Sequence, residues 1–404
     1  MIAYLAPPQL AEFLPGCNLP PVPHTGTRVV LLRHGYSTFN DAECFQGSSD
    51  QSELTARGVA ASQKVGQFLA HCPIDAVYAS PLKRAQDTVA SVLPYLKAPK
   101  LKRLAASALL REIDLPAWEG LRYETVRSQQ PVAYRCWRET PEQFQMTGNH
   151  CKLNEDEAQP SAFYPVRDLY QRAQQFWQMT LPHHRGQTLL VVSHGSTNQA
   201  LINTALGLPP CQHHTIQQTY NGLTVLDFET PHCEQGQLHV LNLTVGDRLP
   251  PVQGNKQGLR LLLLPCQANA SPDPALTTLL QGETVQAAVV EGWEGSRNYP
   301  CHQAAQSLLK HNPETVVLSV QRSQLWHQWQ AAIHRSLNAH THTGLTTVLA
   351  VAQPAPLQHF LRTLLTLPSR SNTVALQSNT LSVVHYPSTQ EHPILQGMNL
   401  SAVV

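Results

Sequence analysis

Residues Leu31–Asn40 read Leu-Leu-Arg-His-Gly-Tyr-Ser-Thr-Phe-Asn, and this stretch decides how the rest of the chain is interpreted. It continues a short apolar run, 29–32, whose length and aliphatic composition predict a buried strand. Arg33 and His34 follow directly, so a cation and an imidazole lie where the strand ends. In open α/β sheets, ligands bind at the carboxyl ends of the strands. The stretch therefore predicts a ligand site at the end of the first strand.

A second stretch has the same design. Residues 189–192 form another apolar run, and His194 follows it one residue later. A further strand is predicted over 76–79, and helices are predicted over 55–71, 81–96 and 195–205. Strands that alternate with helices indicate an α/β sandwich of three layers with a mostly parallel sheet. His34 and His194 are therefore expected at the same edge of that sheet.

The length of 404 residues exceeds what one core usually organises, so about two domains are expected. A polar and aromatic segment, 121–181, interrupts the alternation and predicts a cap over the strand ends, with an amphipathic helix over 165–180. The predicted divisions are a proline-rich arm over 1–26, a catalytic domain over 27–247, a linker over 248–258 and a second domain over 259–404.

The second domain repeats the apolar pattern of the first but lacks its polar residues. Residues 261–264 correspond to 29–32, and 347–352 (TVLAVA) correspond to 188–193 (TLLVVS). Cys266 stands where the first copy has His34, and Gln353 stands where it has His194. We therefore predict a degenerate second copy that is not catalytic.

Five segments, in order, carry a resemblance to a known family. They are LLRHGYSTFN from Leu31, FQGSSDQSELTARG from Phe45, SPLKRAQDT from Ser80, LREIDLPAWEG from Leu110 and VVSHGSTNQA from Val191. In order and spacing they resemble the histidine phosphatase superfamily, whose members include cofactor-dependent phosphoglycerate mutases and many small-molecule phosphatases. The resemblance covers about residues 27–245 and implies that His34 is a phosphoryl-accepting nucleophile.

The roles that the resemblance implies agree with elementary chemistry. The neutral imidazole of His34 can attack a phosphate dianion without charge repulsion. Phosphoryl transfer needs charge stabilisation on the equatorial oxygens, which Arg33 and Arg84 would supply as bidentate donors. His194, if protonated, would add a third cation, and Glu112 would act as the acid and then as the base. Because side-chain cations do this work, no metal ion or other cofactor is expected.

Residues around this centre and in the cap are expected to bind the substrate. They are Asn40, Gln46, Gly47, Ser48, Tyr134, Arg138 and Arg167. Asn40 would add a neutral donor at the rim of the phosphate pocket. The arginines of the cap would meet a second anionic group such as a carboxylate, although a solvated helix face explains Arg138 or Arg167 equally well.

Some segments resemble one branch of the superfamily more closely. The runs Tyr164–Leu169 (YPVRDL), 46–49 (QGSS) and 110–115 (LREIDL) resemble the plant chloroplast 2-carboxyarabinitol 1-phosphate phosphatases. This resemblance implies a phosphatase that acts on a phosphorylated sugar acid. A phosphoserine phosphatase, a phosphoglycerate mutase and a non-catalytic binding protein remain as alternatives.

Composition limits the partners. The net charge of +1 gives no sign of a nucleic-acid partner, and no apolar run approaches the ~20 residues that cross a bilayer. Nine cysteines without a CxxC pair argue against a zinc site or a disulfide framework, so reduced thiols in a cytoplasmic protein are expected. A small phosphorylated metabolite is the expected partner, and a homodimer is left open.

Overall fold

The computed structural model describes most of the chain. The described residues are 22, 25–96, 103–148, 161–230, 236–246, 248–253, 257–267, 276–292, 300–338, 344–367, 373–387 and 392–401, without the side chains of 103, 148, 161 and 334–338. Most of the predicted arm, 1–26, and part of the predicted linker, 248–258, lie outside them.

The first half of the chain forms six strands of a sheet. They are β1 (Thr27–Arg33), β2 (Ala76–Ala79), β3 (Arg103–Ala106), β6 (Gln187–Ser193), β7 (Leu223–Phe228) and β8 (Gly236–Leu243). β1 pairs in parallel with β6 and antiparallel with β7, and β2 pairs in parallel with β6 and β3. The predicted strands are confirmed, and β1 and β6 lie side by side in register, with Arg33 opposite Ser193.

Helices cover both faces of this sheet. The main ones are α2 (Ala56–Phe68), α3 (Lys83–Val92), α6 (Pro165–Thr180) and α7 (Gly195–Ala205). α2 begins after Thr55, whose side chain accepts a hydrogen bond from the amide of Gly58, and α6 begins with Pro165 in its first turn. The helix expected over 81–96 is shorter than predicted, because Pro94 lies in a 3-10 turn that follows α3.

The second half adds six more strands and four helices. The strands are β9 (Gly258–Pro265), β10 (Ala287–Glu291), β11 (Val316–Val320), β12 (Leu345–Ala352), β13 (Leu381–Tyr386) and β14 (Ile394–Leu400). The helices are α8 (Leu276–Leu279), α9 (Pro300–Leu308), α10 (Leu325–Asn338) and α11 (Pro354–Leu364). β9 pairs in parallel with β12 and antiparallel with β13, as β1 does with β6 and β7.

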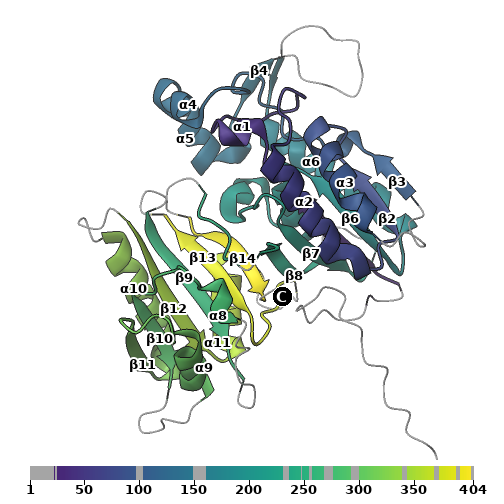
Figure 1. Cartoon of the computed structure of the whole chain (residues 1–404). Helices are drawn as coiled ribbons and strands as arrows, with labels where there is room; N and C mark the ends of the chain where they lie inside the picture. The colour runs from purple at the N-terminus through teal and green to yellow at the C-terminus, as the bar shows by residue number, and fades with distance from the viewer. Residues whose placement is uncertain are drawn as a thin grey trace, which may run out of the picture.

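All of these strands belong to one 12-stranded sheet, in the order β11-β10-β12-β9-β13-β14-β8-β7-β1-β6-β2-β3. Counted outward from the β14–β8 junction, the two halves have the same order of strands (Figure 1). One apolar core lies between the sheet and α2, α3, α8 and α9, and the other lies between the sheet and α6, α7, α10 and α11. Each core runs through both halves.

The predicted cap stands over one end of the first half (Figure 1). It contains α4 (Tyr123–Gln129), α5 (Pro131–Glu139), and the two-stranded sheet of β4 (Met146–Gly148) and β5 (Ser161–Phe163). A short helix, α1 (Thr38–Asp41), lies beside the cap. The cap is thus built from two segments that flank the undescribed stretch 149–160.

The cysteine prediction is partly wrong, because Cys266 and Cys301 form a disulfide. Cys266 follows β9 and Cys301 lies in the first turn of α9, so the fold brings together two residues that are 35 positions apart. Spacing alone gives no sign of such a pair. Cys44, Cys72, Cys136 and Cys211 are not part of a disulfide.

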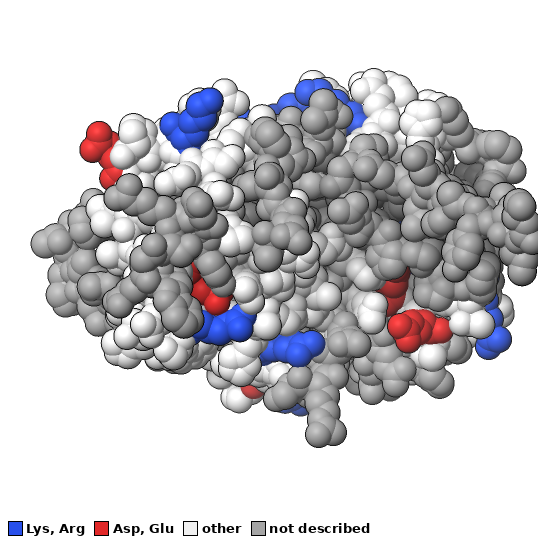
Figure 2. Space-filling model, turned by 90° about the horizontal axis from the view of Figure 1, so that it is seen from below, with Lys and Arg blue, Asp and Glu red and all other residues white. Residues whose placement is uncertain are grey.

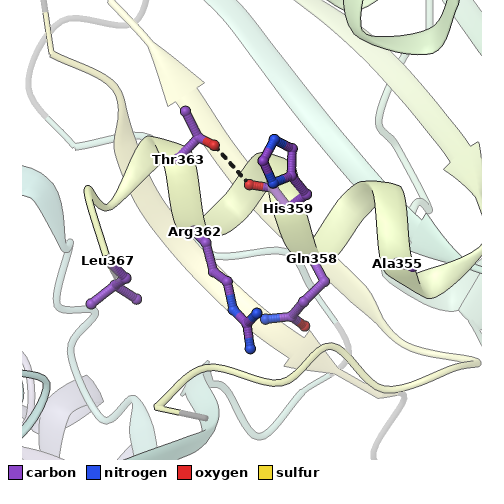
Figure 3. A pocket seen from close by; sticks show the side chains of 6 residues that line it. All are labelled: Ala355, Gln358, His359, Arg362, Thr363 and Leu367. Atoms are coloured by element: carbon purple, nitrogen blue, oxygen red, sulfur yellow. Dashed lines mark hydrogen bonds between the residues drawn. The ribbon is translucent and has the colours of Figure 1, made fainter. Parts of the chain in front are cut away.

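Surface features of the described residues are modest. On the face shown in Figure 2, charged side chains are scattered rather than gathered in a patch of one sign. None of the described helices combines the length and apolar character needed to span a bilayer. A shallow hollow of about 210 Å³ lies on α11, where Gln358 and Arg362 point toward each other (Figure 3). It contains none of the site residues expected from the sequence.

Candidate active site

His34 lies directly after β1, where its backbone amide donates a hydrogen bond to the carbonyl of Ser193 in β6 (2.8 Å). The side chain is 1% exposed. Its Nδ1 lies 2.8 Å from the carbonyl oxygen of Gly35, and since a carbonyl can only accept, Nδ1 carries the hydrogen. Burial, and then the guanidinium groups of Arg84 and Arg33, lower the pKa of His34 well below 6.5. The imidazole is therefore neutral, with the lone pair of Nε2 available.

Arg33 is fixed from several sides. Its Nη1 donates to the carbonyl of Gln218 at 2.6 Å, and its guanidinium lies 3.9 Å from the centre of the Tyr220 ring. Gly195 allows this position, because a Cβ there would lie 3.2 Å from Cζ of Arg33. The Nε of Arg33 is buried and has no hydrogen-bond partner. Among the described residues, this Nε–H donor of Arg33 has no acceptor, so a ligand could accept its hydrogen bond.

Arg84 lies in the first turn of α3 and is 1% exposed. Its Nη1 and Nη2 donate to the carbonyls of Ser49 (3.0 Å) and Gly47 (2.8 Å). Glu119 holds that loop by accepting from the amides of Gly47 and Ser49, both at 3.1 Å. The Nε of Arg84 is buried without a partner. The carbonyl of Gly47, a residue expected to touch substrate, therefore serves to orient Arg84.

His194 follows β6, and its ring centre lies 5.2 Å from that of His34. Its Nε2 lies 2.7 Å from the hydroxyl of Ser80, and its Nδ1 is buried without a partner. Burial, followed by the charge of Arg84, lowers the pKa of His194 well below 6.5. His194 is thus neutral in the unliganded protein, and the third cation considered in the sequence analysis is not present before an anion binds.

Glu112 is 6% exposed and accepts hydrogen bonds through both carboxyl oxygens. Oε1 accepts from the amides of Ile113 (2.8 Å) and Thr197 (3.2 Å), and Oε2 accepts from the amide of Ser196 (3.3 Å). Ser196 and Thr197 lie in the first turn of α7, where the helix dipole favours a negative charge. His194 therefore immediately precedes α7, and the first backbone amides of α7 bind the carboxyl group of Glu112.

The loop and rim residues show two kinds of contact. Asn40 accepts from the amide and the hydroxyl of Ser37 through Oδ1 (3.1 and 2.8 Å), while its Nδ2 is buried without a partner. Gln46 accepts from the hydroxyl of Ser37 at 3.1 Å, and Ser48 donates to Asp114 at 2.8 Å. Asn40 therefore resembles the two arginines in keeping an unpaired donor, whereas Gln46 and Ser48 have partners within the protein.

The cap residues expected to bind substrate differ from one another. Arg138 lies on α5 with Tyr134, and burial lowers the pKa of Arg138. Among the described residues Arg138 makes no ion pair. Arg167 is exposed, donates to the carbonyl of Glu142 at 2.6 Å and lies 4.4 Å from the centre of the Tyr164 ring. The two arginines therefore differ in their contacts: the guanidinium of Arg167 is held by a carbonyl and a ring, whereas that of Arg138 has no carboxylate partner among the described residues.

Arg172 supports the site although its sequence context does not predict this role. This residue of α6 donates to the carbonyls of Arg111 (2.8 Å) and Glu112 (3.2 Å), and so holds the loop that carries the carboxyl group. Burial lowers the pKa of Arg172 to about 10, against the opposing charge of Glu112. In the sequence, Asp168 one helical turn earlier suggests a surface ion pair instead, so the pattern gives no signal for this role.

Comparison with known proteins places this pocket in a family. The family described as Histidine phosphatase superfamily (branch 1) matches residues 29–242. The chain is 33% identical over 267 residues to the probable 2-carboxy-D-arabinitol-1-phosphatase of Arabidopsis thaliana, with 66% of this chain and 50% of the relative covered. It is 35% identical over 211 residues to the 2-carboxy-D-arabinitol-1-phosphatase of Triticum aestivum, with 52% and 39% covered.

A bacterial relative is also similar. Phosphoserine phosphatase 1 of Hydrogenobacter thermophilus is 28% identical over 181 residues, which cover 45% of this chain and 77% of the relative. The chain spans half or less of the length of the two plant relatives. The matched residues 29–242 exceed half of the chain and include His34, Arg33, Arg84, Glu112 and His194. The protein therefore belongs to the histidine phosphatase superfamily.

Proposed function

We propose that the protein is a phosphomonoester hydrolase that works without a metal ion, through a phosphohistidine at His34. One observation supports this most strongly: four buried polar atoms of the residues around the neutral imidazole have no hydrogen-bond partner in the part of the chain that the structure describes. They are Arg33 Nε, Arg84 Nε, Asn40 Nδ2 and His194 Nδ1. An unpaired buried polar group costs about 1–3 kcal/mol. A pocket that keeps four of them suits a ligand with several acceptor oxygens, as a phosphoryl group has.

In the first half-reaction, Nε2 of His34 attacks phosphorus. The Nε2–P bond forms as the ester P–O bond breaks, and Nδ1 keeps its hydrogen on the carbonyl of Gly35, which stabilises the imidazolium that results. Arg33 and Arg84 neutralise the equatorial oxygens. Glu112, carrying a proton in the substrate complex, gives that proton to the leaving oxygen. The alcohol then departs.

In the second half-reaction, water attacks the phosphohistidine. The carboxylate of Glu112 takes the proton of the water as the new P–O bond forms and the P–Nε2 bond breaks. Inorganic phosphate leaves and His34 returns to the neutral imidazole. The hydrogen bonds from the amides of Ser196 and Thr197 suit the carboxylate form that this base requires.

For the substrate, we favour a phosphorylated sugar acid such as 2-carboxyarabinitol 1-phosphate. Both plant relatives are named for this activity, and Arg138 offers a partly buried guanidinium that has no carboxylate partner among the described residues. A carboxylate on the substrate would satisfy it. The phosphoserine phosphatase among the relatives makes an amino acid phosphate the second candidate, since it also carries a carboxylate.

We further propose that residues 259–404 are a degenerate copy of the catalytic domain and carry no phosphatase activity. The matching strand orders support this proposal. So does the register, because Pro265 lies opposite Ala352 as Arg33 lies opposite Ser193. Proline has no side-chain donor, so the second half cannot bind phosphate in the same way.

The test is phosphate release from a panel of metabolites in the presence of EDTA. The panel holds 2-carboxyarabinitol 1-phosphate, phosphoserine, 3-phosphoglycerate and simple sugar phosphates. We expect release by the wild type that EDTA does not affect and that His34→Ala abolishes, whereas His183→Ala, at an exposed histidine, leaves it unchanged. Release that needs a metal ion, isomerisation of 3-phosphoglycerate, or no release from any compound would contradict the proposal.

A further inference from the structure

Two asparagines occupy equivalent places at the junction of the two halves. Asn242 lies in β8 and Asn399 in β14, and both have a left-handed backbone, with φ of 57° and 53°. Such a backbone is tolerated by asparagine better than by most residues. β8 and β14 pair antiparallel, with Met398 opposite Leu241. The junction is therefore arranged about an approximate two-fold axis.

The side chains of these asparagines repeat the same contacts. Nδ2 of Asn242 donates across the junction to the carbonyl of Gln396 (2.7 Å) and within its own half to the carbonyl of Gln217 (2.6 Å). Nδ2 of Asn399 donates across the junction to the carbonyl of His239 (2.8 Å) and within its own half to that of Ala375 (2.8 Å). Each asparagine thus ties one loop to the opposite half.

The two loops are held in the same way at a second point. Oδ1 of Asn242 accepts from the amide of Thr219 (3.0 Å), and Oδ1 of Asn399 accepts from the amide of Gln377 (2.9 Å). The segments 217–219 and 375–377 are therefore equivalent by contact, and both asparagines fix a loop that precedes a strand. If these contacts only stabilised the junction, substitution of Asn242 and substitution of Asn399 should have equal effects.

Only the first of these loops reaches the phosphate pocket. The carbonyl of Gln218 accepts from Nη1 of Arg33, and the ring of Tyr220 lies against the same guanidinium. In the second half, Pro265 holds the register position of Arg33 and has no side-chain donor. The junction is thus symmetric in structure but not in its connection to the chemistry.

The second half holds the first loop directly. The amide of Gln217 donates to the carbonyl of Leu395 (2.9 Å), and Nε2 of Gln396 donates to Oε1 of Gln217 (3.0 Å). Gln396 is fully buried. From the stretch between the halves, Nε2 of Gln253 donates to the carbonyl of Gln218 (2.9 Å). The carbonyl that binds Arg33 therefore belongs to a segment held by strand β14.

We propose that Gln396 of β14 and Asn242 of β8 are positioning residues of the phosphate site: together they fix the segment 217–220 and, through it, the guanidinium of Arg33. This inference rests on the proposed function and gives residues 259–404 a role in phosphate binding rather than in catalysis. Neither Gln396 nor Asn242 touches the phosphoryl group. Their effect passes through the carbonyl of Gln218.

The test compares Asn242→Asp with Asn399→Asp in the full chain. Each change keeps the accepting Oδ1 and a residue type that tolerates a left-handed backbone, and it replaces both donated hydrogen bonds by unfavourable contacts between the new carboxylate and two carbonyl oxygens. We measure kcat, KM, the inhibition constant of inorganic phosphate, and the thermal midpoint. Loss of the support of Arg33 should raise KM and the phosphate inhibition constant by about tenfold in Asn242→Asp. In Asn399→Asp both constants should stay within about twofold of wild type. The thermal midpoint of Asn399→Asp should nevertheless fall about as far as that of Asn242→Asp, because the two variants lose equivalent hydrogen bonds.

Gln396→Leu provides a second and milder variant, because it removes one hydrogen bond without adding a charge. It should shift the phosphate inhibition constant in the same direction as Asn242→Asp, and it decides the question if the aspartate variants do not fold. Equal phosphate constants in Asn242→Asp and Asn399→Asp, or a Gln396→Leu protein with wild-type phosphate affinity, would overturn the proposal. A fall in kcat without a change in KM or in the phosphate inhibition constant would also overturn it, because that result indicates only that a smaller fraction of the protein is active.

Failure of the proposed function gives a different result. In that case the wild type neither releases phosphate from the panel nor binds inorganic phosphate in calorimetry. If the wild type binds phosphate but hydrolyses nothing, the same comparison is made with the calorimetric dissociation constant of inorganic phosphate. A rise of about tenfold confined to Asn242→Asp and Gln396→Leu would support the positioning role, and no such difference would refute it.

Discussion

Cys266 occupies the position in the second half of the sheet that His34 occupies in the first. Each follows the first strand of its half, β9 or β1, and donates its backbone amide to the carbonyl of the last residue of the neighbouring parallel strand, at 2.9 and 2.8 Å. Cys301 is the second residue of α9, as Arg84 is the second residue of α3. The disulfide therefore joins the two places where the first half has His34, the proposed nucleophile, and Arg84, a proposed phosphate ligand.

This arrangement predicts that the disulfide contributes to stability and not to catalysis. Cys266→Ala should leave phosphate release within about twofold of wild type. Because the bond closes a loop between residues 35 apart, its loss should lower the free energy of unfolding by about 4 kcal/mol. Urea denaturation of the wild type and the variant, with and without a thiol reductant, measures this. A large loss of activity at unchanged stability would contradict the prediction.

Gly195 is expected to matter because of its distance from Arg33. A Cβ at this position would lie 3.2 Å from Cζ of the guanidinium, so Gly195→Ala requires Arg33 to shift by a few tenths of an ångström away from its hydrogen-bonded position. We expect the inhibition constant of inorganic phosphate to rise by about tenfold, as for loss of one charged hydrogen bond. Ser196→Ala, one residue further along α7, is the control, since only the backbone amide of Ser196 contacts Glu112. Equal effects of the two variants would contradict this explanation.

Arg172 should act on the proton transfer rather than on phosphate binding. It holds the carbonyls of Arg111 and Glu112, so Arg172→Gln should loosen the carboxyl group. Hydrogen bonds to a charged group are worth about 1.5–3 kcal/mol, which corresponds to a fall in kcat of about 10- to 100-fold. The phosphate inhibition constant should change little, and Arg172→Lys should recover part of the rate. If phosphate affinity falls instead, Arg172 supports the phosphate pocket.

Buried neutral histidines should make the fold sensitive to acid. His213 is fully buried. This burial, and to a smaller extent the positive charge of Arg138, lower the pKa of His213 to about 3. In the unfolded chain a histidine has a pKa of about 6.5, so as the pH falls below 6.5 only the unfolded state takes up this proton and stability is lost. His213→Leu should therefore flatten the decline of unfolding free energy between pH 6 and pH 5 by ~1 kcal/mol per pH unit.

Urea denaturation at pH 7, 6 and 5 measures this slope for the wild type and for His213→Leu. Neither ring nitrogen of His213 has a hydrogen-bond partner among the described residues, so the substitution removes the titrating group without breaking a hydrogen bond. Identical slopes for the two proteins would show that His213 does not contribute to the acid sensitivity.

Local patterns account for what could be predicted from the sequence. The apolar runs that became β1 and β6 are short and continuous, and Thr55 and Pro165 mark helix starts by their own chemistry. The order of the motifs placed His34 and His194 at one edge of the sheet, where their rings lie 5.2 Å apart. The positions of residues that directly follow a strand or begin a helix could therefore be predicted from the sequence.

The features that were missed depend on contacts between distant segments. Arg172 reaches its carbonyl partners only after α6 packs beside the loop of Glu112, and Gln396 meets Gln217 only across the junction of the two halves. The pairing of Cys266 with Cys301 has the same origin. The neutral state of His194 follows from burial, which no local pattern reveals.

The most direct test of the central claim is to identify the phosphorylated residue. The protein is mixed with the compound of the panel that it hydrolyses fastest, quenched in base within milliseconds because phosphohistidine is labile in acid, and digested for mass spectrometry. We expect a phosphoryl group on His34, attached through Nε2, and none on the His34→Ala protein. Rapid phosphate release with no phosphorylated histidine, or with the phosphoryl group on another residue, would contradict it.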